Sequence, residues 1–415
     1  MSSLPNNART AIRFDRHELA GAFGDIGLDL PLMILLVTVC RLDAITAFVL
    51  FGLCQVATGL FYRLPIPVQP LKAMAAIAVA SGLGAQTLAG GGLAVAALML
   101  ALSLSGALGW VARVVPLAVV RGLQFGLGLK LALLALHDHL HAMGTTGYIL
   151  GGSAFLLILL LRDNRKLPAA LAVVAMGLAY VALARPEPPQ PLTVHATPFA
   201  LHLPSPADLL NGLLLLALPQ IPLSVANAVL GTRQTARDLL GQDIPARTLG
   251  LTFSALNVLA ALFGGVGVCH GAGGLAGHYA FGGRTGGSVI IYGSLFVVCG
   301  LLLGPQMLYV ISVFPRPLLA VLLIFEGLTL AQLSRDMLGQ ADGFFVLLLV
   351  ALAGAALPYG FCAGLVGGTL LHLALTWRAR QAAHAPTQPP AGDAFAAPTA
   401  QPAPLDGAKL QTRTP

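Results

Sequence analysis

Residues 67–82 read Pro-Val-Gln-Pro-Leu-Lys-Ala-Met-Ala-Ala-Ile-Ala-Val-Ala-Ser-Gly. Two prolines and an amide open an apolar segment that is too short to cross a bilayer, for which a helix needs about 20 residues. The pattern returns at 264–281, where a Gly-rich stretch and Cys-His-Gly open a second short apolar segment. Non-helical backbone at membrane depth is tolerated only inside protein or beside a wet cavity. We therefore expect two half-helices that flank a central site.

The composition of the whole chain is that of a membrane protein. Of its 415 residues, 57% are hydrophobic and 9% are charged, whereas about a quarter of the residues in a soluble domain are charged. A hydrocarbon core about 30 Å thick leaves room for roughly a dozen to fourteen spans in a chain of this length. The composition predicts an all-α polytopic membrane protein.

The apolar runs divide into two series of seven, about fourteen transmembrane segments in all. The first series lies within 21–184 and the second within 207–380, and a Pro-rich outer linker, 185–206, joins them. An odd number of spans in each half inserts the halves with opposite orientation. We therefore expect two inverted seven-helix repeats, with the half-helices as the third and tenth segments.

The two ends of the chain carry no span. Residues 1–20 lack the apolar core of a signal peptide, and 381–415 are rich in Ala, Pro, Gln and Thr. We expect a cytoplasmic N-terminal arm and a disordered cytoplasmic tail. With both termini inside, most arginines between spans fall in cytoplasmic connections of an inner (plasma) membrane protein. This distribution accounts for the net charge of +7 without nucleic acid as a partner.

The two short segments carry residues suited to an anionic ligand. A helix N-terminus offers unpaired N–H groups and about half a positive charge. The candidates are Val68, Gln69, Lys72, His270, Gly271, Ala272 and Gly273. Lys72 lies in an apolar segment, where a charge costs at least about 2.5 kcal/mol. Three roles explain such a lysine: it attracts the anion, it pairs with a carboxylate, or its ammonium reaches an interface. For His270, the alternative to contact with the ligand is a hydrogen-bonded position in the core.

Acidic residues in apolar segments are candidates for coupling. Asp25 and Asp29 share a helix face, and Glu326 lies in Ile-Phe-Glu-Gly-Leu. Buried carboxyl groups can carry a proton together with a substrate. Structural pairing with Arg121, Lys130 or Lys72 is the alternative.

Gln220 lies between Pro219 and Pro222, early in the second half, at a position that corresponds to the Asp25 segment. Its amide is expected to line the site. A proline kink needed only for packing explains the same residues.

Other chemistry is absent from the sequence pattern. The five cysteines occur singly, which predicts neither disulfides nor a metal site, and the cluster at 137–141 fits a solvated loop. We find no His-Glu-x-x-His, nucleophile elbow or P-loop, so we expect neither an enzyme nor an ATP-driven pump, and no cofactor.

Four motifs in order resemble the molybdate transporter family of plants and bacteria, within the sulfate permease superfamily. They are Gly-Asp-Ile-Gly (24–27), Pro-Val-Gln-Pro-Leu-Lys-Ala-Met-Ala-Ala (67–76), Leu-Pro-Gln-Ile-Pro-Leu (218–223) and Cys-His-Gly-Ala-Gly-Gly-Leu-Ala-Gly (269–277). The resemblance implies a core domain that holds the substrate beside a gate domain. It also places the site between the third and tenth helices, which adds Cys269 to the candidates.

The function that this resemblance implies is secondary transport of a tetrahedral oxyanion. Molybdate is the expected substrate, with sulfate as competitor or second substrate, moved by alternating access with proton coupling through Asp25 or Glu326. A carrier of another small anion or of a nucleobase on the same fold stays open, as does an anion channel. The sequence also leaves the oligomeric state open, a homodimer included.

Overall fold

A computed structural model describes residues 11–161, 169–187, 199–201 and 203–384. The first half contains α1 (Arg16–Gly21), α2 (Ile26–Val39), α3 (Ala44–Tyr62), β1 (Val68–Pro70), α4 (Lys72–Ala80), α5 (Ala85–Ser105), α6 (Leu108–Val114), α7 (Leu117–Leu134), the π-helix η1 (Ala135–His139), α8 (Gly144–Leu161) and α9 (Ala169–Ala184).

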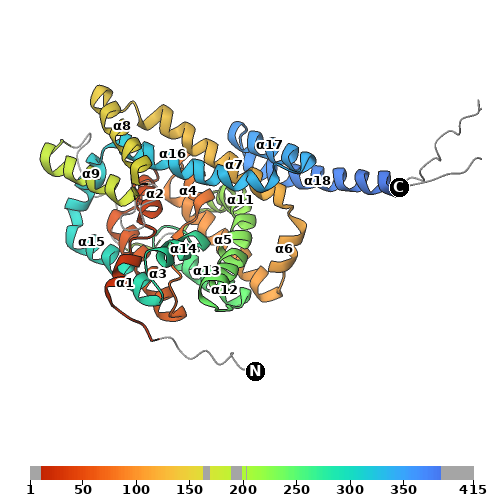
Figure 1. Ribbon diagram of the computed structural model, residues 1–415, viewed down its shortest axis with the longest axis horizontal. Coiled ribbons are helices and arrows are strands. Elements are labelled where there is room, and N and C mark those ends of the chain that lie inside the picture. Colours follow the sequence, from red (N-terminus) through yellow and green to blue (C-terminus); the bar gives the residue numbers. More distant parts are fainter. Residues whose placement is uncertain (1–10, 162–168, 188–198, 202, 385–415) are drawn as a thin grey trace, which may run out of the picture. The chain divides into compact units, whose positions relative to one another are not determined.

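The second half follows a similar order (Figure 1). It contains α10 (Pro206–Asn211), η2 (Gly212–Ala217), α11 (Leu218–Leu223), η3 (Ser224–Gly231), α12 (Thr232–Leu240), α13 (Ala246–Leu262), β2 (Val268–His270), α14 (Ala272–Ala280), α15 (Gly286–Val313), α16 (Arg316–Gln332), η4 (Leu333–Met337), α17 (Ala341–Ala356) and α18 (Gly360–His384). The elements η2 and η3 are π-helices that continue α10, α11 and α12 without a break.

Long apolar helices dominate the described part of the chain. Eight of them are long and apolar enough to cross a membrane, and α2, α9, α13 and α17 contain shorter apolar stretches of 10–17 residues. The predicted helical membrane protein is therefore confirmed.

The short segments at 71–82 and 271–281 form α4 and α14, each nine residues long. A three-residue strand precedes each helix, and β1 and β2 pair antiparallel with Val68 opposite His270 and Pro70 opposite Val268. The second strand and helix lie 200 residues after the first. This small sheet joins two parts of the chain that are far apart in sequence.

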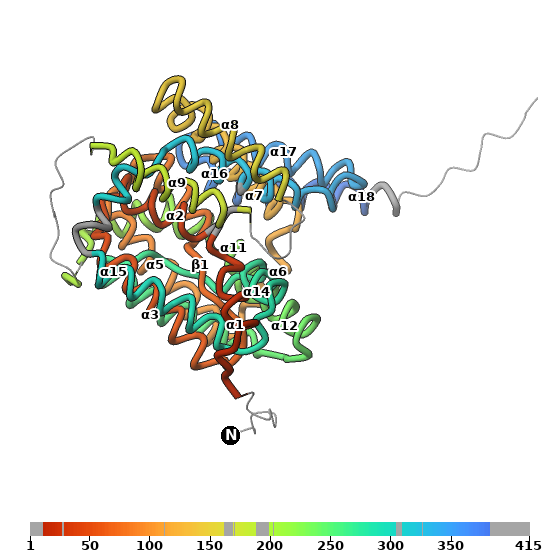
Figure 2. The backbone as a smooth tube through the Cα atoms, turned by 60° about the vertical axis from the view of Figure 1, so that its left-hand side comes forward, coloured from red at the N-terminus to blue at the C-terminus, as the bar shows by residue number. Residues whose placement is uncertain are grey.

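Aromatic packing joins α3 to α15, which run side by side in Figure 1 and in Figure 2. The Phe296 ring lies 4.9 Å from the Phe51 ring and 5.4 Å from the Phe48 ring, centroid to centroid. Lipid chains are as apolar as these side chains, so close van der Waals contact has to stabilise such a pair within a bilayer.

Parts of the expected domain division fall outside the described residues. These are 1–10 of the N-terminal arm, 162–168 of the first repeat, 188–198 and 202 of the linker, and 385–415 of the tail. The described part of the arm is structured, because Asp15 caps α1 by accepting hydrogen bonds from the N–H groups of His17 and Glu18. The second of these bonds holds the pKa of Asp15 below its ordinary value.

Candidate functional site

Two buried amides hold the crossing strands. Gln55 of α3 donates to the Val68 carbonyl at 2.6 Å and accepts from the Val68 N–H at 2.9 Å. Asn257 of α13 does the same for Val268, at 2.6 and 2.9 Å. Neither side chain is exposed. Each strand is therefore fixed at its first residue by one amide on the preceding long helix.

The paired strands bring the N-termini of α4 and α14 to opposite ends of one short ladder. The N–H of Leu71, the residue before α4, donates to the Gly267 carbonyl at 2.9 Å, which extends the pairing by one residue. The first N–H groups of a helix have no partner within the helix and carry its positive end. Two such ends therefore flank the strands.

Open space lies beside the first turn of α14. Gly273 is exposed, and a Cβ built on it meets no atom within 4 Å. Its neighbours are packed: a Cβ on Gly271 would collide with the Gln69 amide, and one on Gly274 would collide with the Asp25 carboxylate. Glycine is needed at these two positions because the side chains of Gln69 and Asp25 approach the backbone closely.

Asp25 and Gln69 form the centre of the site. The Gln69 Nε2 donates to both carboxylate oxygens of Asp25, at 2.6 and 2.8 Å, and both residues are buried. The Gln69 Oε1 is buried and accepts no hydrogen bond from the residues that the structure describes. An amide oxygen without a donor costs free energy in a buried place, so it marks a position where a donor on a ligand or water would be stabilising.

Gln220 occupies the equivalent place in the second half. Its Oε1 accepts the N–H of Met74, the third residue of α4, at 3.1 Å, and its Nε2 donates to Ser224 at 3.0 Å. Asp25 lies against Gly274, the third residue of α14. Each helix end is thus met by a polar side chain from the opposite half, an acid at α14 and an amide at α4.

The remaining candidates divide into two groups. Lys72 and Ala272 begin the two short helices and are half-buried, and the buried Cys269 lies opposite Gln69 in the strand pairing. The His270 side chain extends in another direction, because its Nε2 lies 2.7 Å from the Thr252 hydroxyl and 3.5 Å from that of Tyr62. Its Nδ1 is buried and has no hydrogen-bond partner in the described part of the chain.

Among the acids and bases, Arg121 is not the partner of Asp25, because it binds Asp336 at 2.6 Å. Asp29 is fully buried and accepts a 3.1 Å hydrogen bond from the Tyr292 hydroxyl of α15. Glu326 lies on α16, but its side chain falls outside the described residues. Of the three cations that the sequence offers as partners of the buried acids, Arg121 is thus held by Asp336.

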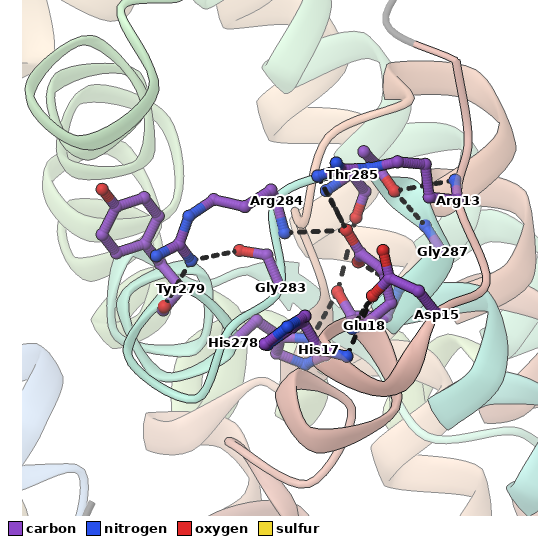
Figure 3. A network of polar contacts seen from close by, with 11 residues as sticks. Arg13, Asp15, His17, Glu18, His278, Tyr279, Gly283, Arg284, Thr285 and Gly287 are labelled. Carbon is purple, nitrogen blue, oxygen red and sulfur yellow. Dashed lines mark hydrogen bonds and ion pairs between the residues drawn. The ribbon is translucent and has the colours of Figure 1, made fainter.

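The N-terminal helix fixes the loop that follows α14. Figure 3 shows the Glu18 carboxylate directed at the backbone of Arg284 and Thr285. Its Oε1 accepts both N–H groups, at 3.0 and 2.9 Å, and its Oε2 accepts the N–H of Ser288 at 3.0 Å. A carboxylate at the start of α15 satisfies unpaired donors and complements the positive helix end.

Arg284 closes the same loop from the other side. Its guanidinium lies 3.6 Å from the Tyr279 ring centroid and donates to the carbonyls of Tyr279 and Gly283, at 2.6 and 2.8 Å (Figure 3). These contacts hold the end of α14. They agree with a loop role for Arg284 rather than contact with a ligand.

The matching family model is described as a molybdate transporter of the MFS superfamily and covers residues 17–131 and 212–330. The chain belongs to the molybdate transporter family. It is 34% identical to Molybdate transporter 2 of Arabidopsis thaliana over 404 residues, which covers 86% of this chain and 87% of that protein. It is 30% identical to Molybdate transporter 1 of Chlamydomonas reinhardtii, over 84% of this chain and 90% of that protein.

Solved transporters share the fold of this family member. The transmembrane domain of a cyanobacterium bicarbonate transporter, BicA, aligns with a TM-score of 0.61 at 16% identity, over 88% of this chain and 98% of that chain. SLC26A9 aligns with a TM-score of 0.68 at 11% identity, over 87% of this chain and 65% of that chain. The resemblance to the molybdate transporter family is confirmed, and the fold is shared with BicA and SLC26A9. The chain is a membrane transport protein and not an enzyme.

The matched family regions contain every residue expected in the site, but sequence reasoning missed the residues that hold it. Gln55 and Asn257 lie 13 and 11 residues before the valines that they bind. An amide inside an apolar span requires a partner, so both were detectable as polar residues in the second and ninth apolar runs. Glu18 gave no comparable signal, because its partners lie 266 to 270 residues further along the chain.

Proposed function

We propose that this protein is a secondary transporter that carries molybdate across the cell's inner membrane by alternating access. Membership of the molybdate transporter family supports the substrate. The open first turn of α14, beside the buried pair of Asp25 and Gln69, is the observation that carries the proposal. Sulfate, a tetrahedral dianion of the same charge, is the competing anion.

The architecture that we propose has fourteen membrane segments in two inverted repeats, 21–184 and 207–380. The eight long helices, the four shorter apolar helices and the two nine-residue helices supply that number. The antiparallel pairing of β1 with β2 and the matching amide contacts support an inverted relation between the halves. In this arrangement α4 and α14 are half-helices of a core domain, and both termini are cytoplasmic.

The anion would bind at the open first turn of α14. Backbone N–H groups of Ala272 and Gly273 would donate to its oxygens, and the Lys72 ammonium would supply positive charge from the start of α4. Val68 and Cys269 would lie on either side within the strand pair, where Gln55 holds both backbone groups of Val68. Gln69 would take part by holding the Asp25 carboxylate beside the binding turn. Backbone N–H donors in a rigid helix turn bind a tetrahedral dianion without having to rearrange, which favours tight binding.

Proton coupling follows from the place of Asp25. Its carboxylate lies against Gly274, within the turn to which the dianion would bind. Two negative groups at one helix end repel each other, so a proton on Asp25 would stabilise the occupied site. We therefore propose that a proton is carried with the anion, and that Glu326 is a second candidate to carry it.

The test is uptake of labelled molybdate into liposomes that contain the purified protein, with and without an inward proton gradient and with excess sulfate. Lys72→Ala is expected to reduce uptake at least tenfold. Arg113→Ala, which removes an exposed cation bonded to the Gly109 carbonyl, is the matched control. Asp25→Asn is expected to remove the dependence on the proton gradient.

The binding position is tested by filling the open space. Gly273→Leu adds a side chain whose Cβ meets no described atom within 4 Å outside its own helix turn, so the fold should persist while uptake is lost. Gly367→Leu, on α18, also has open space and is the matched control. Uptake of Gly273→Leu equal to that of wild type would exclude this turn as the binding place. No saturable uptake of molybdate or sulfate by the wild type would instead indicate another small anion.

A further inference from the structure

A cavity of about 240 Å³ shares no lining residue with the proposed anion site. On one side it is lined by Ile77 and Ser81, at the end of α4, and by Leu214 and Leu215 of η2. On the other side it is lined by Lys130 of α7 and by residues 357–362, which comprise the link from α17 to α18 and the first residues of α18. The cavity therefore contacts two groups of helices.

The walls of this cavity are mostly apolar, and Lys130 provides one cation. Its Nζ lies 5.7 Å from the centroid of the Phe361 ring. Across the residues that the structure describes, no carboxylate lies within 4.0 Å of it. A lysine that faces an aromatic ring and, among the described residues, no acid keeps its charge available for an anionic ligand.

The chemistry of the walls distinguishes between two kinds of anion. A small inorganic dianion needs many donors, and here Ile77, Leu214, Leu215 and Phe361 would leave most of its oxygens without any. A carboxylate with a hydrocarbon chain suits both the cation and the apolar walls, because its head contacts Lys130 and its chain contacts the leucines. The cavity is somewhat smaller than the range of about 300–1,000 Å³ typical of ligand sites, which suits a medium-length chain.

The position of the cavity agrees with this kind of ligand. Ser81 ends α4 and the segment 357–360 joins two helices, so the cavity lies where spans end. Such places lie near the level of lipid head groups, where the charged head of an amphipathic molecule resides. Leu357 and Tyr359, at the rim, are 56% and 48% exposed. The cavity is thus reachable from outside the helix bundle.

We propose that this cavity binds a medium-chain fatty acid, with its carboxylate on Lys130. A ligand placed there contacts α4 and η2 on one side and α7 and the α17–α18 link on the other. If these groups move past each other during transport, an occupied cavity holds them in one arrangement. The fatty acid should therefore inhibit uptake. This inhibition rests on the proposed transport function, whereas binding of the fatty acid does not.

Cys362 lines the cavity and reports its occupancy directly. Cys40, Cys54 and Cys269 are buried, so Cys299→Ser leaves Cys362 as the accessible thiol. In this variant, maleimide modification of Cys362 is followed by mass spectrometry with octanoate or its neutral analogue octanamide. We expect octanoate to slow the modification at least tenfold and octanamide to have little effect. In Lys130→Gln the two compounds should act alike.

Equal protection by octanoate and octanamide in the Lys130 protein would overturn the proposal, as would full protection by octanoate in Lys130→Gln. If the Cys362 thiol reacts too slowly with maleimide, ¹⁹F NMR of fluorinated octanoate with wild type and Lys130→Gln measures binding instead. Absence of binding there also overturns it. In liposomes, octanoate should lower the maximal rate of molybdate uptake without changing KM. If octanoate protects Cys362 as expected but the protein takes up no molybdate, the proposed transport function is rejected and the fatty-acid site stands.

Discussion

Replacing Asn257 with leucine removes the clamp on β2 while keeping a side chain of similar size. The Val268 N–H and carbonyl would then be buried without partners, since Asn257 alone supplies the two side-chain bonds to them. Each buried polar group left unpaired costs about 1 to 3 kcal/mol, so the variant should lose about 2 to 6 kcal/mol. Protein stability is typically about 5 to 15 kcal/mol, so this loss is large.

The assay has two parts, because the clamp stabilises the fold and also positions α14. The apparent midpoint of thermal unfolding is compared at one scan rate, since unfolding of such proteins is often irreversible. Molybdate uptake is then measured below the lowest midpoint, where we expect a KM raised at least tenfold. Asn227→Leu is the control, because this amide of η3 makes no side-chain hydrogen bond within the described residues.

The double variant Gln55→Leu/Asn257→Leu tests whether both amides act on one unit. Val68 and Val268 belong to the same two-stranded ladder, so the two substitutions should be coupled. The stability loss of the double variant should be smaller than the sum of the losses of the two single variants. Strictly additive losses, or a midpoint of Asn257→Leu equal to that of Asn227→Leu, would refute the reasoning.

Three further variants test other contacts. Gly271→Ala should abolish uptake, because its methyl group displaces the Gln69 amide, and normal uptake would show that this packing is unimportant. Glu18→Gln should lower the unfolding midpoint, because an NH₂ group would replace one of the two oxygens that accept backbone N–H groups; an unchanged midpoint would contradict this role. Asp243 accepts hydrogen bonds from two arginines, which hold its pKa well below the ordinary range. The ion pairs of Asp243 therefore stabilise the fold above its unfolded-state pKa of about 4, and this stabilisation is lost as pH falls through its lower pKa in the folded state. The difference in unfolding midpoint between wild type and Asp243→Asn should accordingly be constant from pH 8 to 5 and shrink in stronger acid.

Much of the fold was predictable because the deciding signals are local. The short apolar segments after Pro70 and Gly271 carry their own evidence in length and composition, and the structure forms α4 and α14 there. The pairing of Gln69 with Asp25 is different, because 44 residues separate them and no spacing rule joins them. The direction of the His270 side chain toward Thr252 was equally hidden, since it depends on how α13 packs against β2.

The contact between Glu18 and the start of α15 also sets an order of events during synthesis. The partners of Glu18 lie at least 266 residues further on, and ribosomes add about 5 to 20 residues each second. The N-terminal helix therefore waits about 13 to 53 s before its carboxylate can find those N–H groups. Assembly of this end of the molecule finishes late, so a ribosome that stalls before residue 284 leaves a nascent chain whose first helix has no docking place.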